Sequence, residues 1–305
     1  MIFLIQNQNA MYVAIDDSGV VCDQVSLNGN IVMYSSCKAI DAKLAFNNFS
    51  IKYVCEGDEI YSLKNQEFVV KSNQYLLCNS TCEGSVLIDS KTHVKGICID
   101  ISNEIISEVL ATHLAPDTNI VDLSLGTFFH SENFLEWQFD GRFTCLGQHL
   151  KRLEHIIMRD PYHGYTFEHE FYYNLSENII SDYIPLIKQF RNIRCVKNET
   201  KKDLLRRLTK GKEFLEQHYC EELDIEKVAN ESNISQYHFF RLFRSVYGVS
   251  PYQYLKQLRL NKAKELLQKN KLPLAQLAIE IGYCDIYSFS KAYKQMFGHS
   301  PTVTV

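Results

Sequence analysis

Residues 223–251, LDIEKVANESNISQYHFFRLFRSVYGVSP, and residues 272–301, LPLAQLAIEIGYCDIYSFSKAYKQMFGHSP, are two copies of one pattern. The offset between them is 49 residues at the start and 50 from Ser235 and Asp285 onward, so the second copy has one extra residue in its turn. A repeated pattern marks a repeated structural unit. Apolar residues recur at helical spacing on both sides of a short polar turn, which predicts a helix, a turn and a second helix in each copy.

Three positions in each copy define the predicted turn and helix ends. A residue that tolerates positive φ lies in the turn, an N-cap residue begins the second helix, and a glycine ends it. In the first and second copies these residues are Asn233 and Gly282, Ser235 and Asp285, and Gly248 and Gly298. Ala229 and Ala278 are small enough to let the two helices of a copy cross closely.

Each second helix is predicted to have one core face and one exposed face. Spacing of i, i+3, i+4 and i+7 predicts these core residues: Phe239, Leu242, Phe243, Val246, and Phe289, Ala292, Tyr293, Met296. The opposite faces carry aromatic, hydroxyl and cationic groups, which suit contact with base edges in a DNA major groove. The alternative, a helical bundle with a basic solvated face, fits one copy better than it fits two.

Residues 203–305 resemble the DNA-binding domain of the AraC/XylS family of bacterial transcription regulators. The resemblance is carried by residues 248–267, GVSPYQYLKQLRLNKAKELL, and by residues 281–301 of the second copy. It implies seven helices, with a linker helix that holds both recognition helices on one side of a DNA duplex, about 34 Å apart. It also implies a transcription activator that contacts RNA polymerase.

The resemblance assigns roles to individual residues. Base contacts are expected from Tyr237, Phe240, Arg241, Ile286, Tyr287, Ser288 and Lys291. Phosphate contacts are expected from Ser235, His238, Arg244, Asp285 and Lys294. Arg241 is the first choice because a guanidinium can bond O6 and N7 of guanine together. Phe240 either packs on a thymine methyl or turns into the core, Lys291 stands where many members have Arg, and Arg259 is predicted to be structural.

The charge of the chain is divided unevenly. The formal net charge is −4, but residues 201–305 hold 17 Lys+Arg and 11 Asp+Glu, a balance of +6, and the remainder holds 15 and 25, a balance of −10. A basic part beside an acidic part predicts one module for a polyanion and another that stays away from it. The basic segment that runs on from Arg191 is either a solvated linker or a linker that also touches phosphates.

The predicted fold class is α+β, with an antiparallel barrel-like or sandwich-like N-terminal domain. Short apolar segments recur every 8 to 12 residues up to residue 101, which is typical of such sheets. A helix from Asn103 to Leu114 and a helical hairpin follow. The hairpin either covers the sheet or forms a dimer interface. The predicted divisions are a sensor region, 1–101, a helical region, 102–192, a basic linker, 193–202, and a DNA-binding domain, 203–305.

No enzyme, cofactor or metal signature is found. His93 is the only histidine in the strand region, and no catalytic or nucleotide-binding motif appears. One alternative is an N-terminal enzyme fused to a DNA-binding domain, but the metal constellation that a metal-dependent enzyme needs is not found. The other alternative, an adaptor that never touches DNA, leaves the two matched recognition faces unexplained. Ten cysteines lie far apart, and Cys78 and Cys82, the only close pair, are predicted to be loop or core thiols. We expect a cytoplasmic, non-membrane protein that binds double-stranded DNA, and whose acidic N-terminal part senses a small-molecule effector, forms a homodimer, or does both.

Overall fold

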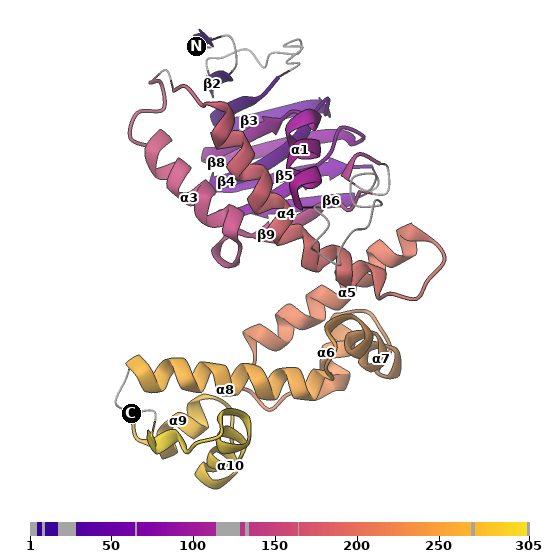
Figure 1. Ribbon diagram of the computed structural model, residues 1–305, viewed down its shortest axis with the longest axis vertical. Coiled ribbons are helices and arrows are strands. Elements are labelled where there is room, and N and C mark those ends of the chain that lie inside the picture. Colours follow the sequence, from indigo (N-terminus) through magenta and orange to yellow (C-terminus); the bar gives the residue numbers. More distant parts are fainter. Residues whose placement is uncertain are drawn as a thin grey trace. The chain divides into compact units, whose positions relative to one another are not determined.

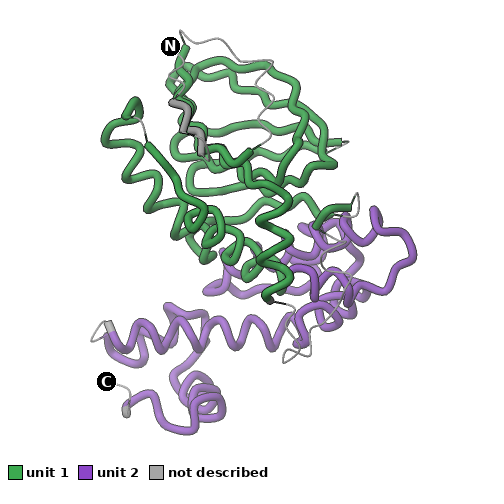
Figure 2. The backbone as a smooth tube through the Cα atoms, turned by 45° about the horizontal axis from the view of Figure 1, so that its top comes forward, with its two compact units in different colours: residues 1–185 green, residues 186–305 purple. Residues whose placement is uncertain are grey.

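The computed structural model divides the chain into two compact units, residues 1–185 and residues 186–305 (Figure 2). The structure describes residues 5–7, 10–17, 29–64, 66–113, 129–131, 134–163, 165–269 and 272–303 (Figure 1). Leu114, at the end of the first predicted helix, lies outside these residues.

A nine-stranded sheet forms the body of the first unit in the part that the structure describes. Its strands are β1 (Ile5–Asn7), β2 (Ala10–Asp16), β3 (Ile31–Ala45), β4 (Phe49–Glu56), β5 (Asp58–Leu63), β6 (Gln66–Lys71), β7 (Gln74–Cys78), β8 (Glu83–Ile101) and β9 (Trp137–Asp140). The order is β1-β2-β3-β8-β4-β7-β9, and β5 pairs with β8 and β6. The pairs are antiparallel apart from β2 with β3, which is parallel, and the described pairings do not close into a ring.

Strand β8 joins two halves of the sheet. The sequence spacing predicts separate strands at 85–89 and 94–100, but the structure has one strand of 19 residues. Its first half pairs with β5, from Gly84 to Leu87, and its second half pairs with β4, from Lys95 to Ile101. Strand β3 pairs with both halves, with a register shift between Cys37 and Ala39. The exposed polar residues 91–93 interrupt the apolar pattern without ending the strand.

Two helices of the first unit form the predicted hairpin beside the sheet (Figure 1). The helical elements are α1 (Asn103–His113), η1 (Gly141–Phe143), α3 (Cys145–Ile157) and α4 (His169–Arg191). Asp182 of α4 accepts hydrogen bonds from the backbone N–H groups of Cys145 and Leu146 at 3.1 and 2.8 Å, which joins α4 to the start of α3. The hydroxyl of Tyr53 in β4 donates to Glu154 of α3 at 2.6 Å. The hairpin therefore packs on the sheet.

The second unit is helical. After the end of α4 it contains α5 (Asn198–Gln217), α6 (Ile225–Glu231), α7 (Gln236–Tyr247), α8 (Pro251–Lys269), α9 (Leu274–Glu280), α10 (Ile286–Phe297) and η2 (Pro301–Val303). One core cluster joins α8, α9 and α10, and its fully buried members include Leu260, Ala278 and Phe289. Within the described ranges of the chain, no helix is long and apolar enough to cross a membrane.

Candidate nucleic-acid interface

The two sequence copies fold into the same local structure, α6–turn–α7 and α9–turn–α10. In the first copy the backbone N–H of Ile234 donates to the carbonyl of Ala229 at 3.0 Å, and in the second Tyr283 donates to Ala278 at 2.8 Å. Both alanines are fully buried where the helices cross. A further matching pair of bonds, each 3.0 Å, joins Asn233 to the carbonyl of Asn230 and Gly282 to that of Ile279. The extra residue of the second copy follows these bonds.

The predicted turn and end residues adopt the expected backbone conformations. Asn233 has φ 50° and Gly282 has φ 86°, so both turns use the left-handed region that these residue types tolerate. Helices α7 and α10 both end on a glycine in that region, and these are Gly248 and Gly298. Each glycine N–H bonds back to the helix, at 3.0 and 2.9 Å. The turns and C-caps predicted from sequence are confirmed.

The two N-caps differ. The carboxylate of Asp285 accepts hydrogen bonds from the N–H groups of Tyr287 and Ser288, both at 2.8 Å, and from the hydroxyl of Ser288 at 2.7 Å. These bonds, led by that from the Ser288 N–H, lower the pKa of Asp285. Ser235 holds the corresponding position with extended backbone, but its side chain makes no cap bond. The prediction of a side-chain cap is therefore confirmed for Asp285 and wrong for Ser235.

The core face of each second helix follows the predicted spacing, with one exception. The four residues predicted in α7 are buried, as are Phe289, Ala292 and Tyr293 of α10. Met296 is 38% exposed, so its assignment to the core is wrong. It is the penultimate residue of α10, and the partly buried Phe297 packs against the core cluster of this copy in its place.

The residues predicted to contact bases lie on the outer faces of α7 and α10. The side chains of Tyr237, Arg241, Tyr287, Ser288 and Lys291 are exposed, and those of Phe240 and Ile286 are partly buried. The guanidinium of Arg241 lies 5.6 Å from the ring centre of Tyr237. The residues predicted to contact phosphates, which are Ser235, His238, Arg244, Asp285 and Lys294, are all exposed. The structure thus brings each predicted set to the surface of its helix, and the contacts with DNA stay predictions.

A family model described as a helix-turn-helix domain matches residues 228–305, which include both copies. The C-terminal unit contains a helix-turn-helix domain. Over 89 residues the chain is 34% identical to the probable transcriptional regulator LumQ of Photobacterium leiognathi and 30% identical to the virulence regulon transcriptional activator VirF of Yersinia enterocolitica. These alignments span 29% of this chain and 36% and 33% of the relatives, so the chain spans about a third of the length of the relatives it matches.

Solved structures of proteins with AraC-type DNA-binding domains are similar to about a third of the chain. One is the crystal structure of a transcriptional regulator from Chromobacterium violaceum, with AraC-type DNA-binding domain in its description. It is 28% identical, with a TM-score of 0.32, and the match covers 32% of this chain and 88% of that one.

Helix α8 lies between the two helix-turn-helix units, and Arg259 joins it to the segment that precedes α6. The Nε of Arg259 donates to the carbonyl of Tyr219 at 2.6 Å, and Nη2 donates to the carbonyl of Glu221, also at 2.6 Å. Gly282 lies against the same group, since a Cβ added there would be 2.7 Å from the Cys220 carbonyl oxygen and 2.9 Å from Cζ of Arg259. The structural role predicted for Arg259 is what these bonds show. Burial lowers the pKa of Arg259.

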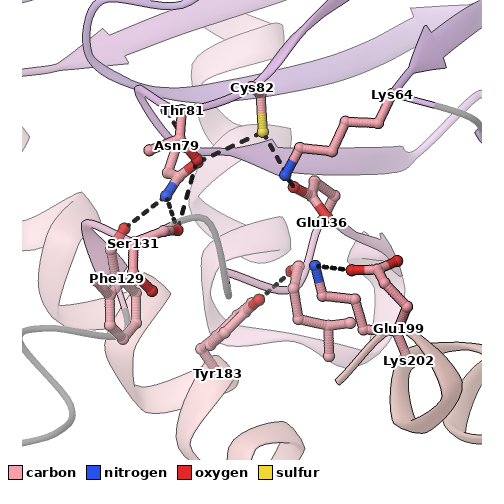
Figure 3. A network of polar contacts seen from close by, with 11 residues as sticks. Lys64, Asn79, Thr81, Cys82, Phe129, Ser131, Glu136, Tyr183, Glu199 and Lys202 are labelled. Carbon is pink, nitrogen blue, oxygen red and sulfur yellow. Dashed lines mark hydrogen bonds and ion pairs between the residues drawn. The ribbon is translucent and has the colours of Figure 1, made fainter. Parts of the chain in front are cut away.

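The close cysteine pair of the first unit belongs to its core. Cys78 and Cys82 are buried free thiols in one apolar cluster. The thiol of Cys82 contacts Asn79 Oδ1 at 3.5 Å and Glu136 Oε1 at 3.3 Å, and Lys64 pairs with the same Glu136 oxygen at 2.9 Å (Figure 3). Asn79 also donates to the carbonyls of residues 129 and 131. Cys82 is therefore part of a polar network that fixes the turn between β7 and β8.

A second polar cluster is formed around the buried Lys52 by the neighbouring strands β4 and β8. Its ammonium donates to the thiol of Cys98 and is 3.9 Å from Asp100 Oδ1, and it lies 5.1 Å from the centre of the Phe46 ring. Burial lowers the pKa of Lys52, but Cys98 and Asp100 outweigh burial and raise it. Burial, reinforced by Asp100, raises the pKa of Cys98 to about 11. Among the residues that the structure describes, no three His, Cys, Asp or Glu side chains are grouped as metal ligands.

Proposed function

We propose that the chain is a sequence-specific DNA-binding transcription regulator. The observation that carries the proposal is the pair of matching helix-turn-helix units, each of which presents an exposed face of aromatic, hydroxyl and cationic side chains. Such helices fit the major groove, where side chains can distinguish all four base pairs. The balance of +6 over residues 201–305 favours approach to the phosphate backbone.

The full chain tests this proposal directly. Selection from a library of random duplexes is expected to enrich one site of about 20 base pairs, because two recognition helices in successive major grooves span about two turns of DNA. Binding to that site is expected to weaken steeply as salt is raised. If selection returns no enriched sequence, the proposal is wrong.

Arg241 provides the sharpest test of base recognition. Arg241→Ala is expected to cost about 1 to 3 kcal/mol on the selected duplex and to relax specificity at one position, because a bidentate contact with guanine is lost. Fluorescence anisotropy with the selected duplex and its single-base variants measures both effects. Lys294→Ala, expected to remove a phosphate contact, should weaken all these duplexes alike. Equal losses across all sequences for Arg241→Ala would contradict a base contact.

The N-terminal unit is proposed to sense a small-molecule effector, to form a homodimer, or to do both. Residues 1–200, which include this unit, have a charge balance of −10. DNA repels this charge, which leaves the unit free for these roles. Sedimentation velocity of the full chain at micromolar concentration tests the dimer, and a monomer throughout would exclude it. Reconstituted transcription with bacterial RNA polymerase tests activation, the role that the name of the relative VirF suggests.

A further inference from the structure

A concave surface with a volume of about 660 Å³ lies on one flank of α7. Most of its lining comes from α7, but one side chain, Arg194, comes from the segment that precedes α5. Four of its lining residues are basic, and these are Arg194, His238, Arg241 and Arg244. We call this surface the Arg194 groove.

Arg194 is held against α7 by its neighbours in the chain. Ile193 is 1% exposed, so the residue next to Arg194 is anchored in the core. The hydroxyl of Ser245 in α7 donates to the carbonyl of Asn192 at 2.9 Å. Because both tethers lie within two residues of Arg194, its backbone keeps a fixed place beside α7, although its side chain is exposed.

The Arg194 groove carries positive charge without compensation. No carboxylate is among its lining residues. Among the residues that the structure describes, its three guanidinium groups make no ion pair, and Arg241 contacts the ring and hydroxyl of Tyr237. Three guanidinium groups around one concavity create a positive potential, and a guanidinium binds phosphate oxygens through two parallel hydrogen bonds. The chemistry of the groove is therefore that of a phosphate site.

The position of Arg241 indicates that the phosphate belongs to DNA. Arg241 belongs both to the outer face of α7 and to the Arg194 groove, so the groove begins where the base-contacting face ends. When a recognition helix lies in the major groove, its flanks face the sugar-phosphate backbone. We propose that the Arg194 groove binds one DNA strand through its phosphates, with Arg194 as a phosphate contact from outside the helix-turn-helix units. This inference rests on the proposed function.

The salt dependence of binding by the full chain tests the proposal. Each phosphate contact contributes about 0.9 to the slope of log K against log salt concentration. Arg194→Ala is therefore expected to reduce this slope by about 1 and to weaken binding to selected and scrambled duplexes alike, by about tenfold at low salt. Arg194→Lys is expected to keep most of the slope, because it keeps the charge. Unchanged thermal unfolding of both variants separates the effect from loss of structure.

Lys197→Ala is the matched control, because it removes one positive charge from the same segment but does not line the groove. It is expected to change the slope much less than Arg194→Ala. Equal effects of the two variants, or no effect of Arg194→Ala, would overturn the proposal. Calorimetry with tripolyphosphate tests whether the groove binds a free phosphate compound instead of DNA. Saturable tripolyphosphate binding that Arg194→Ala abolishes, together with an unchanged salt slope for DNA, would also overturn the proposal. If the wild-type chain enriches no DNA site, the proposed function itself fails.

Discussion

At the scale of single residues, Asp285 and Ser235 occupy one position in two copies of the same unit but do different things. The side chain of Asp285 accepts two backbone N–H bonds, and the side chain of Ser235 accepts none. Asp285→Ala is therefore expected to lower the melting temperature of the C-terminal unit, because the first turn of α10 loses its cap. Ser235→Ala is the matched control and should change it little. Equal shifts in circular dichroism melts of the two variants would contradict this difference.

The charge of Asp285 also predicts a dependence on pH. Its pKa is lowered in the folded chain, so the ionised carboxylate stabilises the fold above the pKa of an unfolded Asp, about 3.9. This contribution is lost as the pH falls through the lower pKa of the folded state. Asp285→Asn keeps a cap that does not titrate. The stability difference between wild type and Asp285→Asn should therefore shrink between pH 6 and pH 2, and a constant difference would contradict the assignment.

Gly282 and Gly248 distinguish two costs of replacing a glycine, the strain of a left-handed backbone and the steric clash of a new Cβ. Both have positive φ, but only Gly282 lacks room for a Cβ, since space around Gly248 is open. Gly248→Ala is expected to cost about 1 to 2 kcal/mol from the left-handed backbone alone. Gly282→Ala should cost more, because the new methyl meets the Cys220 carbonyl and Arg259. Urea titrations give both free energies of unfolding, and equal values would show that the contact at Gly282 relaxes freely.

Sequence predicted the residues whose role is fixed locally, and among those whose role depends on distant neighbours it predicted Arg259 but not Arg194. Asn233, Gly282 and Asp285 act through their own turn, where residue type and position suffice. The missing bond of Ser235 depends on its rotamer, which sequence does not set. Arg194 lies within a visible basic segment, but only the fold places it beside α7.

At the scale of elements, Arg259 joins helix α8 to the connection between α5 and α6. Arg259→Ala is expected to cost about 1 to 3 kcal/mol of stability, because the carbonyls of Tyr219 and Glu221 lose a charged donor. It should also weaken binding to a duplex with both half-sites more than to one with a single half-site, since the spacing of α7 and α10 is less defined. Arg259→Lys, which cannot span two carbonyls in the same way, is expected to fall between. If Arg259→Ala reduces affinity for both duplexes equally, Arg259 contributes to stability alone and not to the spacing of α7 and α10.

The elements themselves show where periodicity succeeds. The apolar spacing placed the core faces of α7 and α10 correctly up to Met296, near a helix end where the buried stripe runs out. In the sheet, a polar stretch inside a strand has the same sequence pattern as a turn, so the sequence predicts two strands where the structure has one. Strand β8 continues through residues 91–93 because β3 pairs with it on both sides of that stretch, which only the tertiary structure shows.

At the scale of the whole molecule, the net charge of −4 describes neither part of the chain. The basic residues of 201–305 include those on the outer faces of α7 and α10. The basic side chains that line the Arg194 groove lie next to the outer face of α7. The acidic remainder includes the sheet, whose interior holds the cluster of Lys52, Cys98 and Asp100. Sequence alone divided the charge correctly, but the interior cluster was not foreseen, because its members come from strands that pair across the sheet.

The two compact units are expected to unfold in separate steps, because each has its own apolar core. The single tryptophan, Trp137, is 9% exposed in the first unit, so its fluorescence reports that unit alone. Lys52→Met is expected to destabilise the fluorescence transition in urea by up to about 3 kcal/mol, because Asp100 loses its buried partner. Gly282→Ala should leave this transition in place and shift only the part of the 222 nm circular dichroism signal that comes from the helices of the second unit. If either variant moves both signals together, the units unfold as one and their cores are not independent.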